Sequence, residues 1–292
     1  MKKYALFILS SLLLTACSSC DLLFNNNKQK DDGKEPTYSP NYAWQLKLDG
    51  TQIGSQMYMQ QPFIYLIERL HTDDADIQLV KIDMDTGRYV WKADQISDGE
   101  QWRSSNIVKA DNKLYFMRKN GIIYCYSDID GTRLARIQVG TTEQEALHNR
   151  YKLKTIVTDG TALYWGSAGE PGSISAHLLK LDLDAIDYTQ NGAIQIRVPR
   201  SLYTKADWRQ CIFWSAPIID DNVLYFNTYN RDYPNGYSTL VAIDLQSEAV
   251  KWEKKLHGLQ GVVYNPLLIQ KNIIYIYWIR RFYESINKMV IY

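Results

Sequence analysis

Two segments of this sequence, Leu79–Trp91 (LVKIDMDTGRYVW) and Leu240–Trp252 (LVAIDLQSEAVKW), share one pattern. Each begins with an apolar run that ends in Asp, continues through a polar stretch, and reaches a Trp eight residues after the Asp. Asp is a typical turn residue because its carboxylate bonds to nearby backbone groups, and Gly accepts a positive φ. The pattern therefore predicts two antiparallel strands joined by a tight turn. The structural repeat positions are Asp83, Gly87 and Trp91 in the first segment and Asp244 and Trp252 in the second.

A Tyr flanked by apolar residues recurs along the chain. The positions are Tyr65, Tyr115, Tyr164, Tyr225 and Tyr275, with spacings of 50, 49, 61 and 50 residues. A turn-like dipeptide precedes each Tyr strand and another apolar run precedes most of these turns, which predicts a hairpin. A third strand follows, as at Ile122–Ser127, and in most units a fourth. A period of this size indicates a solenoid or a propeller, and four antiparallel strands per unit favour a propeller.

The pattern of Leu79–Trp91 resembles a PQQ-like repeat, the blade unit of quinoprotein propellers and of BamB-type lipoproteins. The resemblance covers residues 42–292, is weaker at 128–134, where Leu134 takes the Trp position, and is weakest around 182–199. It implies an all-β fold, a β-propeller of four-stranded antiparallel blades of the WD40/YVTN-like kind, with about five blades visible. An unrelated β-sandwich with Asp-Gly turns is the alternative, and the repeated spacing disfavours it.

The first segment of the domain, Trp44–Gly50 (WQLKLDG), resembles Trp252–Gly258 (WEKKLHG). This similarity predicts that Trp44 begins a fourth strand and completes a last blade whose third strand is Met289–Tyr292. The ring would then close without open sheet edges. A longer propeller that is truncated at its C-terminal end is the alternative, and the sequence leaves both open.

The first sixteen residues have the features of a lipoprotein signal peptide. Lys2 and Lys3 precede an apolar run, Ala5–Leu14, that is too short to span a bilayer. The following Leu-Thr-Ala-Cys resembles the lipobox of bacterial lipoproteins, which implies cleavage before Cys17, attachment of a diacylglyceryl group to its thiol, and several acyl chains on this residue, palmitate among them. More than one acyl chain gives stable anchoring to the lipid bilayer. A plain signal peptide followed by a chance Cys is the alternative.

Residues 17–41 are polar and predict a lipidated flexible tether, followed by the propeller domain at 42–292. Ser18, rather than Asp, follows Cys17, and in enterobacteria-like sorting this favours the outer membrane. The three other cysteines are an odd number, which does not fit a disulfide scaffold. Whether Cys20 is modified stays open, and Cys125 and Cys211 are predicted to be small core residues.

No catalytic, cofactor-binding or metal-binding residue is predicted. The four His residues lack metal-site spacing. The Asp83/Asp85 and Asp128/Asp130 pairs lack the rest of a calcium loop and are interpreted as turn residues. The adjacent Cys residues of quinoprotein dehydrogenases are missing, so no quinone cofactor is expected. A formal net charge of +1 gives no overall field for nucleic acid, so no nucleic-acid partner is expected.

These features predict a membrane-anchored lipoprotein of the periplasmic face or cell surface, not an enzyme, that acts as a protein-binding scaffold. Its partner is an unidentified envelope protein, and the resemblance to BamB-type lipoproteins implies a role in outer-membrane protein assembly. The alternative is a small-ligand or glycan-binding propeller, or a degenerate quinoprotein-type enzyme. The aromatic loop Tyr229–Tyr237 (YNRDYPNGY) suits either a binding loop or a solvated turn.

Overall fold

In the computed structural model the chain divides into two units, Met1–Ala43 and Trp44–Tyr292. The structure describes residues 46, 48, 52–53, 57–70, 76–97, 104–118, 121–140, 155–167, 176–189, 193–206, 210–212, 217–230, 237–256, 268–270, 273–279 and 286–291. The signal peptide, Cys17, the tether and Trp44 lie outside the described residues. Within those ranges, no helix has the length and apolar character needed to cross a membrane.

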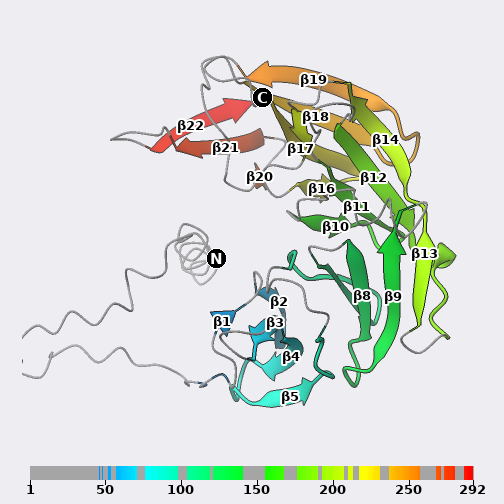
Figure 1. Ribbon diagram of the computed structural model, residues 1–292. Helices are drawn as coiled ribbons and strands as arrows, with labels where there is room; N and C mark the ends of the chain where they lie inside the picture. The colour runs from blue at the N-terminus through cyan, green and yellow to red at the C-terminus, as the bar shows by residue number, and fades with distance from the viewer. Residues whose placement is uncertain are drawn as a thin grey trace, which may run out of the picture. The chain divides into compact units, whose positions relative to one another are not determined.

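The described strands form five sheets, shown in Figure 1. The first contains β1 (Gln52–Ile53), β2 (Tyr58–Gln60), β3 (Phe63–Arg69), β4 (Ile77–Asp83) and β5 (Tyr89–Lys92). The second contains β6 (Val108–Ala110), β7 (Lys113–Met117), β8 (Ile122–Ser127) and β9 (Arg133–Val139). The third contains β10 (Ile156–Thr158), β11 (Ala162–Gly166), β12 (Ala176–Asp182) and β14 (Arg200–Lys205). The fourth contains β15 (Gln210–Ile212), β16 (Ile218–Asp220), β17 (Val223–Asn230), β18 (Ser238–Asp244) and β19 (Val250–Leu256). The fifth contains β20 (Leu268–Gln270), β21 (Ile273–Ile279) and β22 (Ile286–Ile291).

Strand order in each sheet follows chain order, and these pairs are antiparallel. β1 and β2 both pair with β3 and occupy one strand position between them, as β15 and β16 do beside β17. The first four sheets therefore each have four antiparallel strand positions. The predicted four-stranded unit is confirmed.

One strand breaks this regularity. β13 (Ile194–Arg197) lies in the sequence between two strands of the third sheet, yet it pairs in parallel with β9 of the second. It is the outermost strand of the second sheet. The segment between β12 and β14, which also contains the 3-10 turn Leu183–Ala185, lengthens this unit and explains the spacing of 61 between Tyr164 and Tyr225.

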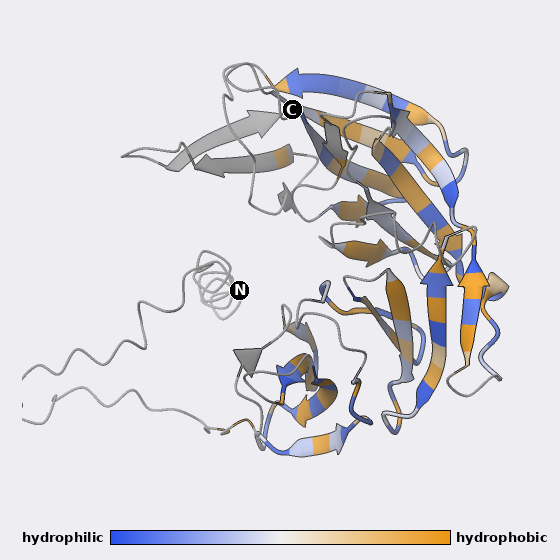
Figure 2. Cartoon of the chain, viewed as in Figure 1, coloured by the Kyte–Doolittle hydropathy of each residue, from blue (hydrophilic) through white to orange (hydrophobic). Residues whose placement is uncertain are grey.

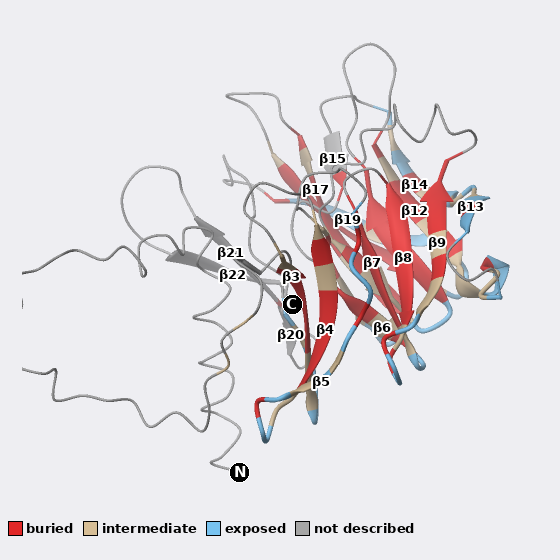
Figure 3. Ribbon diagram, turned by 60° about the horizontal axis from the view of Figure 1, so that its bottom comes forward, coloured by how far each residue is buried: buried red, intermediate tan, exposed pale blue. Residues whose placement is uncertain are grey.

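The hydrophobic core lies between successive sheets, and the second and third sheets each pack with both faces against a neighbour. The central strands β8 and β11 are therefore almost entirely buried, whereas the outer strand β19 is mostly exposed (Figure 3). β9 and β13 alternate between apolar and polar residues, whereas β19 is mostly hydrophilic (Figure 2). The recurring Tyr side chains enter these cores: Tyr65 between the first and second sheets, Tyr115 between the second and third, and Tyr164 between the third and fourth.

Two residues of the predicted N-terminal strand are described, and they contact the free face of the first sheet. Leu46 and Leu48 pack against Leu66, Val80 and Ile82 on the side opposite the second sheet. The predicted pairing of Trp44–Gly50 with Met289–Tyr292 lies outside the described residues.

The register places Trp91 opposite Lys81 and Trp252 opposite Ala242, and each pair borders a β-bulge. The same register position in the second sheet holds Ala135, opposite Cys125. The assignment of Leu134 to the Trp position was therefore wrong by one residue. Size and hydrophobicity favoured Leu134, but side chains alternate along a strand, so Leu134 faces away from the side that Ala135 occupies.

Candidate functional site

The first polar cluster, the Asp128 cluster, joins the first sheet to the second and consists of Tyr65, Lys81, Lys109 and Asp128. Asp128 Oδ1 accepts hydrogen bonds from Tyr65 Oη at 2.7 Å and from Lys81 Nζ at 2.9 Å. Asp128 Oδ2 accepts one from Lys109 Nζ at 2.6 Å. Lys81 comes from β4 and Asp128 from the turn after β8, so the cluster connects residues of different sheets. Lys81 and Asp128 are 5% and 7% exposed, which makes this a buried ion pair.

The environment of Asp128 keeps its carboxylate charged. Burial raises the pKa of Asp128, but hydrogen bonds from Lys109, Lys81 and Tyr65 outweigh burial, and the net pKa lies below its ordinary value. Burial and the bond to Asp128 together raise the pKa of Tyr65, so this hydroxyl stays protonated and donates. All three donors are thus matched to one carboxylate, and the cluster has the character of a structural joint.

Trp91 completes the same joint. Its Nε1 donates to the Asp128 carbonyl at 3.0 Å, and its ring lies against the turn that contains Gly131. Gly131 has φ +73°, and a Cβ at this position would approach Trp91 Cε3 to 2.7 Å. Both its backbone conformation and the closeness of the indole therefore require Gly here.

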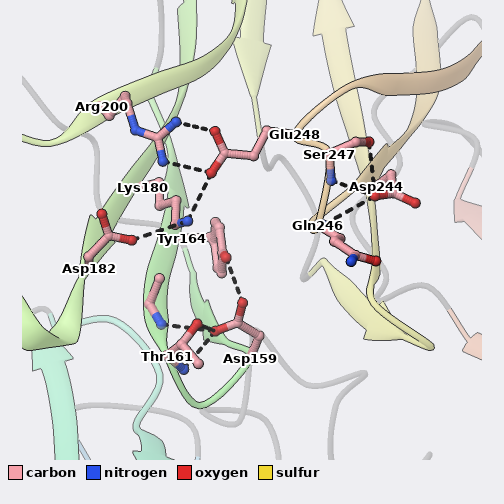
Figure 4. A network of polar contacts seen from close by, with 11 residues as sticks. Asp159, Thr161, Tyr164, Lys180, Asp182, Arg200, Asp244, Gln246, Ser247 and Glu248 are labelled. Atoms are coloured by element: carbon pink, nitrogen blue, oxygen red, sulfur yellow. Dashed lines mark hydrogen bonds and ion pairs between the residues drawn. The ribbon is translucent and has the colours of Figure 1, made fainter.

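The second cluster, the Glu248 clasp, joins the third sheet to the fourth and consists of Lys180, Arg200 and Glu248 (Figure 4). Glu248 Oε1 accepts hydrogen bonds from Lys180 Nζ at 2.9 Å and from Arg200 Nη2 at 2.6 Å, and Oε2 is bonded to Arg200 Nη1. The bidentate pairing fits the planar fork of Arg. Lys180 also lies 3.1 Å from Asp182 Oδ1.

The Asp128 cluster and the Glu248 clasp are related by the repeat. Lys180 pairs with Arg200 across the third sheet as Lys81 pairs with Trp91 across the first, each beside a turn of the following sheet. In this arrangement Arg200 occupies the Trp position. Glu248, with φ +57°, occupies the turn position where the first two sheets have Gly87 and Gly131.

We expect Glu248→Gln to lower the free energy of unfolding by about 1 kcal/mol at neutral pH, a value typical of a partly exposed ion pair. The bond from Arg200 lowers the pKa of Glu248 to about 2, from an ordinary value of 4.5. A lowered folded-state pKa contributes stability above 4.5 that is lost as the pH falls toward 2. The difference between wild type and variant, measured by urea unfolding, should therefore shrink over this range.

Glu248→Gly is the matched control. This change removes the same ion pairs. It also removes the strain of the left-handed backbone conformation, which costs a non-Gly residue about 1–2 kcal/mol. The Gly variant should consequently be at least as stable as the wild type. If the Gly and Gln variants were equally destabilised, the ion pairs and not the backbone would control this turn.

The predicted repeat residues lie in turns. Asp83 Oδ1 accepts hydrogen bonds from the Thr86 backbone N–H and hydroxyl at 2.8 and 2.7 Å. Asp244 Oδ1 accepts equivalent bonds from the Ser247 backbone N–H and hydroxyl at 2.8 and 3.0 Å, as Figure 4 shows. The Thr86 hydroxyl and backbone lower the pKa of Asp83, and Ser247 does the same for Asp244. Each carboxylate thus stabilises its own turn by bonding to a residue three positions later.

The ring of His177 is paired with two hydroxyl groups. His177 Nδ1 lies 3.1 Å from both Ser201 Oγ and Thr204 Oγ1, on the surface of the third sheet. Burial lowers the pKa of His177, so the neutral ring shares its nitrogen between two hydroxyls. In the part of the chain that the structure describes, no group of three or more His, Cys, Asp or Glu side chains is placed to hold a metal ion.

Sequence reasoning assigned Asp128 to a turn and missed its contact with the first sheet. The available signal was Lys81, a charged residue within the apolar run LVKID, at a position where the related unit has Ala242. A Lys in a buried strand needs an acidic partner, because an unpaired buried charge is costly. Lys180 gives the same signal in the third unit.

The strand β13 differs from the paired polar clusters, because its apolar side chains face solvent. Ile194, Ile196 and Val198, hereafter the β13 row, are 47%, 47% and 62% exposed. The side chains between them face the protein. Gln195 is buried and makes two bonds with the Asp187 backbone, at 3.0 and 2.6 Å, and Arg197 Nε donates to the Ala185 carbonyl at 2.6 Å. A shift of one residue in the pairing of β13 would exchange its buried and exposed side chains. These polar bonds hold the pairing in place.

Comparison with known proteins found no matching family model and no similar sequence among curated proteins. Among solved structures, hydrazine synthase of Kuenenia stuttgartiensis matches with a TM-score of 0.51 and 10% identity, over 87% of this chain and 66% of that chain. BamB of Moraxella catarrhalis matches with a TM-score of 0.48 and 13% identity, over 80% of this chain and 60% of that chain. Quinohemoprotein alcohol dehydrogenase of Comamonas testosteroni matches with a TM-score of 0.48 and 11% identity, over 83% and 40%.

The chain has the fold of a β-propeller. Its repeated four-stranded sheets pack face to face, and one of these solved structures matches with a TM-score above 0.5. At these identities the comparisons concern the propeller fold alone. The chain spans 60% and 66% of the BamB and hydrazine synthase chains that it matches, so the activities and partners of those proteins do not transfer to this propeller directly.

Proposed function

We propose that this chain is a lipid-anchored envelope protein whose propeller is a non-enzymatic scaffold that binds another protein. The β13 row is the observation that carries the proposal. Exposed apolar residues grouped on one strand, with their register fixed by polar bonds beneath, have the character of a contact surface. The polar clusters between the sheets support binding rather than catalysis, because their charged groups are already paired with one another.

The process in which the scaffold acts is proposed from the sequence. The repeat resembles that of BamB-type lipoproteins, and the lipobox ends in Cys17, so we place the chain at the outer membrane, in outer-membrane protein assembly. A glycan or small-ligand site remains the second class, and the Tyr229–Tyr237 loop is the feature that would suit it, since Tyr and Asn provide contact area and hydrogen bonds at low entropy cost.

The binding function is tested with the full-length, affinity-tagged chain crosslinked in its own cells. After solubilisation of the membranes, the chain is captured and its companions are quantified by mass spectrometry against an untagged strain. We expect at least one envelope protein to be enriched in stoichiometric amount. Recovery of the chain alone, at crosslinking levels that trap known envelope complexes, would contradict a scaffold function.

The anchor is tested separately. Cells fed a clickable palmitate analogue should label the wild-type chain, whereas Cys17→Ala should carry no label, because the thiol of Cys17 is the expected acceptor. Cys20→Ala is the matched control, since Cys20 lies close by in the same segment. Label that persists in Cys17→Ala would show that lipidation occurs elsewhere or that the segment is a plain signal peptide.

A further inference from the structure

The backbone edge of β13 is open on the side away from β9. β13 is the terminal strand of the second sheet in the described part of the chain. The Arg197 carbonyl accepts a hydrogen bond from Gly140 N at 3.1 Å, on the β9 side. The N–H and C=O of one residue point to the same side of a strand and alternate along it. The backbone groups of Ile194 and Ile196 therefore point away from β9. The Ile196 carbonyl accepts a bond from Arg197 Nη1 at 2.9 Å, whereas the Ile196 N–H faces the free edge.

Sheet edges are usually protected, and the contrast with the fourth sheet is direct. Its outer strand β19 carries Lys251, Glu253, Lys254 and Lys255, and charged side chains of this kind prevent edge-to-edge pairing. β13 instead presents Ile194 and Ile196 beside its open edge. Pro199, which has no N–H, follows Val198 and limits pairing to a short segment.

The strands at this edge carry charge of one sign, whereas Asp184 and Asp187 lie in the neighbouring segment that bonds to β13. β8, β9 and β13 together contain Arg133, Arg136 and Arg197 and no Asp or Glu. Arg136 lies beside Ile194 in the parallel register, so a cation and the apolar row share one face of the sheet. An incoming strand that places apolar residues over the β13 row and carboxylates near these Arg side chains would satisfy both features.

We propose that β13 is a docking strand, to which an extended segment of a partner protein, rich in acidic and β-branched apolar residues, adds as the next strand of the second sheet. Main-chain hydrogen bonds at an open edge provide affinity in such strand addition, and alternate side chains provide specificity. The two-residue spacing of the β13 row fits a strand, whereas a docked helix needs anchors three and four residues apart. This inference rests on the proposed scaffold function and names the partner's chemistry at the same site.

The test uses the full-length chain in detergent micelles and a fluorescein-labelled octapeptide of alternating Val and Glu. Fluorescence anisotropy should show binding of this peptide at least about tenfold tighter than that of an otherwise identical Val and Lys peptide, and the binding should weaken with added salt. Ile196→Pro removes an outward-facing N–H without removing a bond to β9, and should weaken binding by about tenfold or more. The double change Ile194→Asp and Ile196→Asp should have a similar effect, because its carboxylates repel the peptide.

Val250→Asp is the matched control, since Val250 is also exposed, at 43%, on the outer strand of the fourth sheet. It should bind the Val and Glu peptide like the wild type, and all variants should melt at the wild-type temperature. Equal affinity for the two peptides, or unchanged affinity in Ile196→Pro, would overturn the docking-strand proposal. The capture experiment judges the scaffold function independently, because a partner that is still recovered with Ile196→Pro supports a scaffold that binds elsewhere.

Discussion

Replacing Asp128 by Ala is expected to destabilise the propeller by about 3–5 kcal/mol, because the change leaves the buried Lys81 ammonium without its carboxylate. Lys109 and Tyr65 lose their partner at the same time. For a domain of this size, a loss of this magnitude should lower the melting temperature by roughly 10 °C. The measurement is thermal unfolding followed by Trp fluorescence.

Asp130→Ala is the control for this prediction. Asp130 lies in the same turn but is exposed, and its Oδ1 accepts one bond from Thr132 N at 3.1 Å. It should cost about 1 kcal/mol or less. The pKa of folded Asp128 lies below its ordinary value, so its contribution is present near neutral pH and is lost as the pH falls through the acid range. Equal melting temperatures for Asp128→Ala and Asp130→Ala would contradict the assignment of a buried joint.

The second large effect is expected at the contact of Trp91 with Gly131. Trp91→Ala should cost about 3 kcal/mol, the lower part of the range for removing a buried aromatic side chain. Gly131→Ala should also destabilise, both because φ is +73° and because the new Cβ would overlap the indole. In the double variant the indole is absent, so only the backbone cost of Gly131→Ala remains. The two changes should therefore be less than additive, by about 1 kcal/mol or more.

Gly160→Ala serves as the backbone control. Gly160 also has a positive φ, +94°, but a Cβ there would meet nothing within 4 Å. Gly160→Ala should lower the free energy of unfolding as much as Gly131→Ala does in the Trp91→Ala background. This loss should not change when Trp91 is replaced. Strict additivity of Trp91→Ala and Gly131→Ala in urea unfolding would mean that the first and second sheets do not meet through this pair.

The repeat could be predicted because its signals are local. An apolar run, an Asp turn and a late Trp lie within thirteen residues in Leu79–Trp91, the same order recurs at Leu240–Trp252, and the Tyr strands recur at spacings of 50, 49, 61 and 50. Each strand has to bury its side chains against the next sheet, so the Tyr period shows directly in the sequence. The register of Trp91 and Trp252 follows from the same local order.

The features that escaped prediction depend on contacts between distant residues. β13 pairs with β9 across more than fifty positions, and its outward Ile194 and Ile196 reverse the alternation expected of a strand that covers a core. Arg200 holds the Trp position in the third unit, and the insertion before it shifts the spacing, so the local pattern did not identify this position. The joint at Asp128 is formed by a side chain that local patterns assign to a turn, and only the position of Lys81 within an apolar run indicated a buried partner.

We propose that this propeller works by holding another protein and not by chemistry at a cofactor. The most direct measurement is the native mass of the full-length chain released from its own membrane in mild detergent, together with its absorption spectrum. We expect a lipidated chain in complex with one protein partner, with no added quinone or metal mass and no quinone absorbance. A chain that carries a stoichiometric quinone, metal ion or small ligand, with no protein partner, would contradict this proposal.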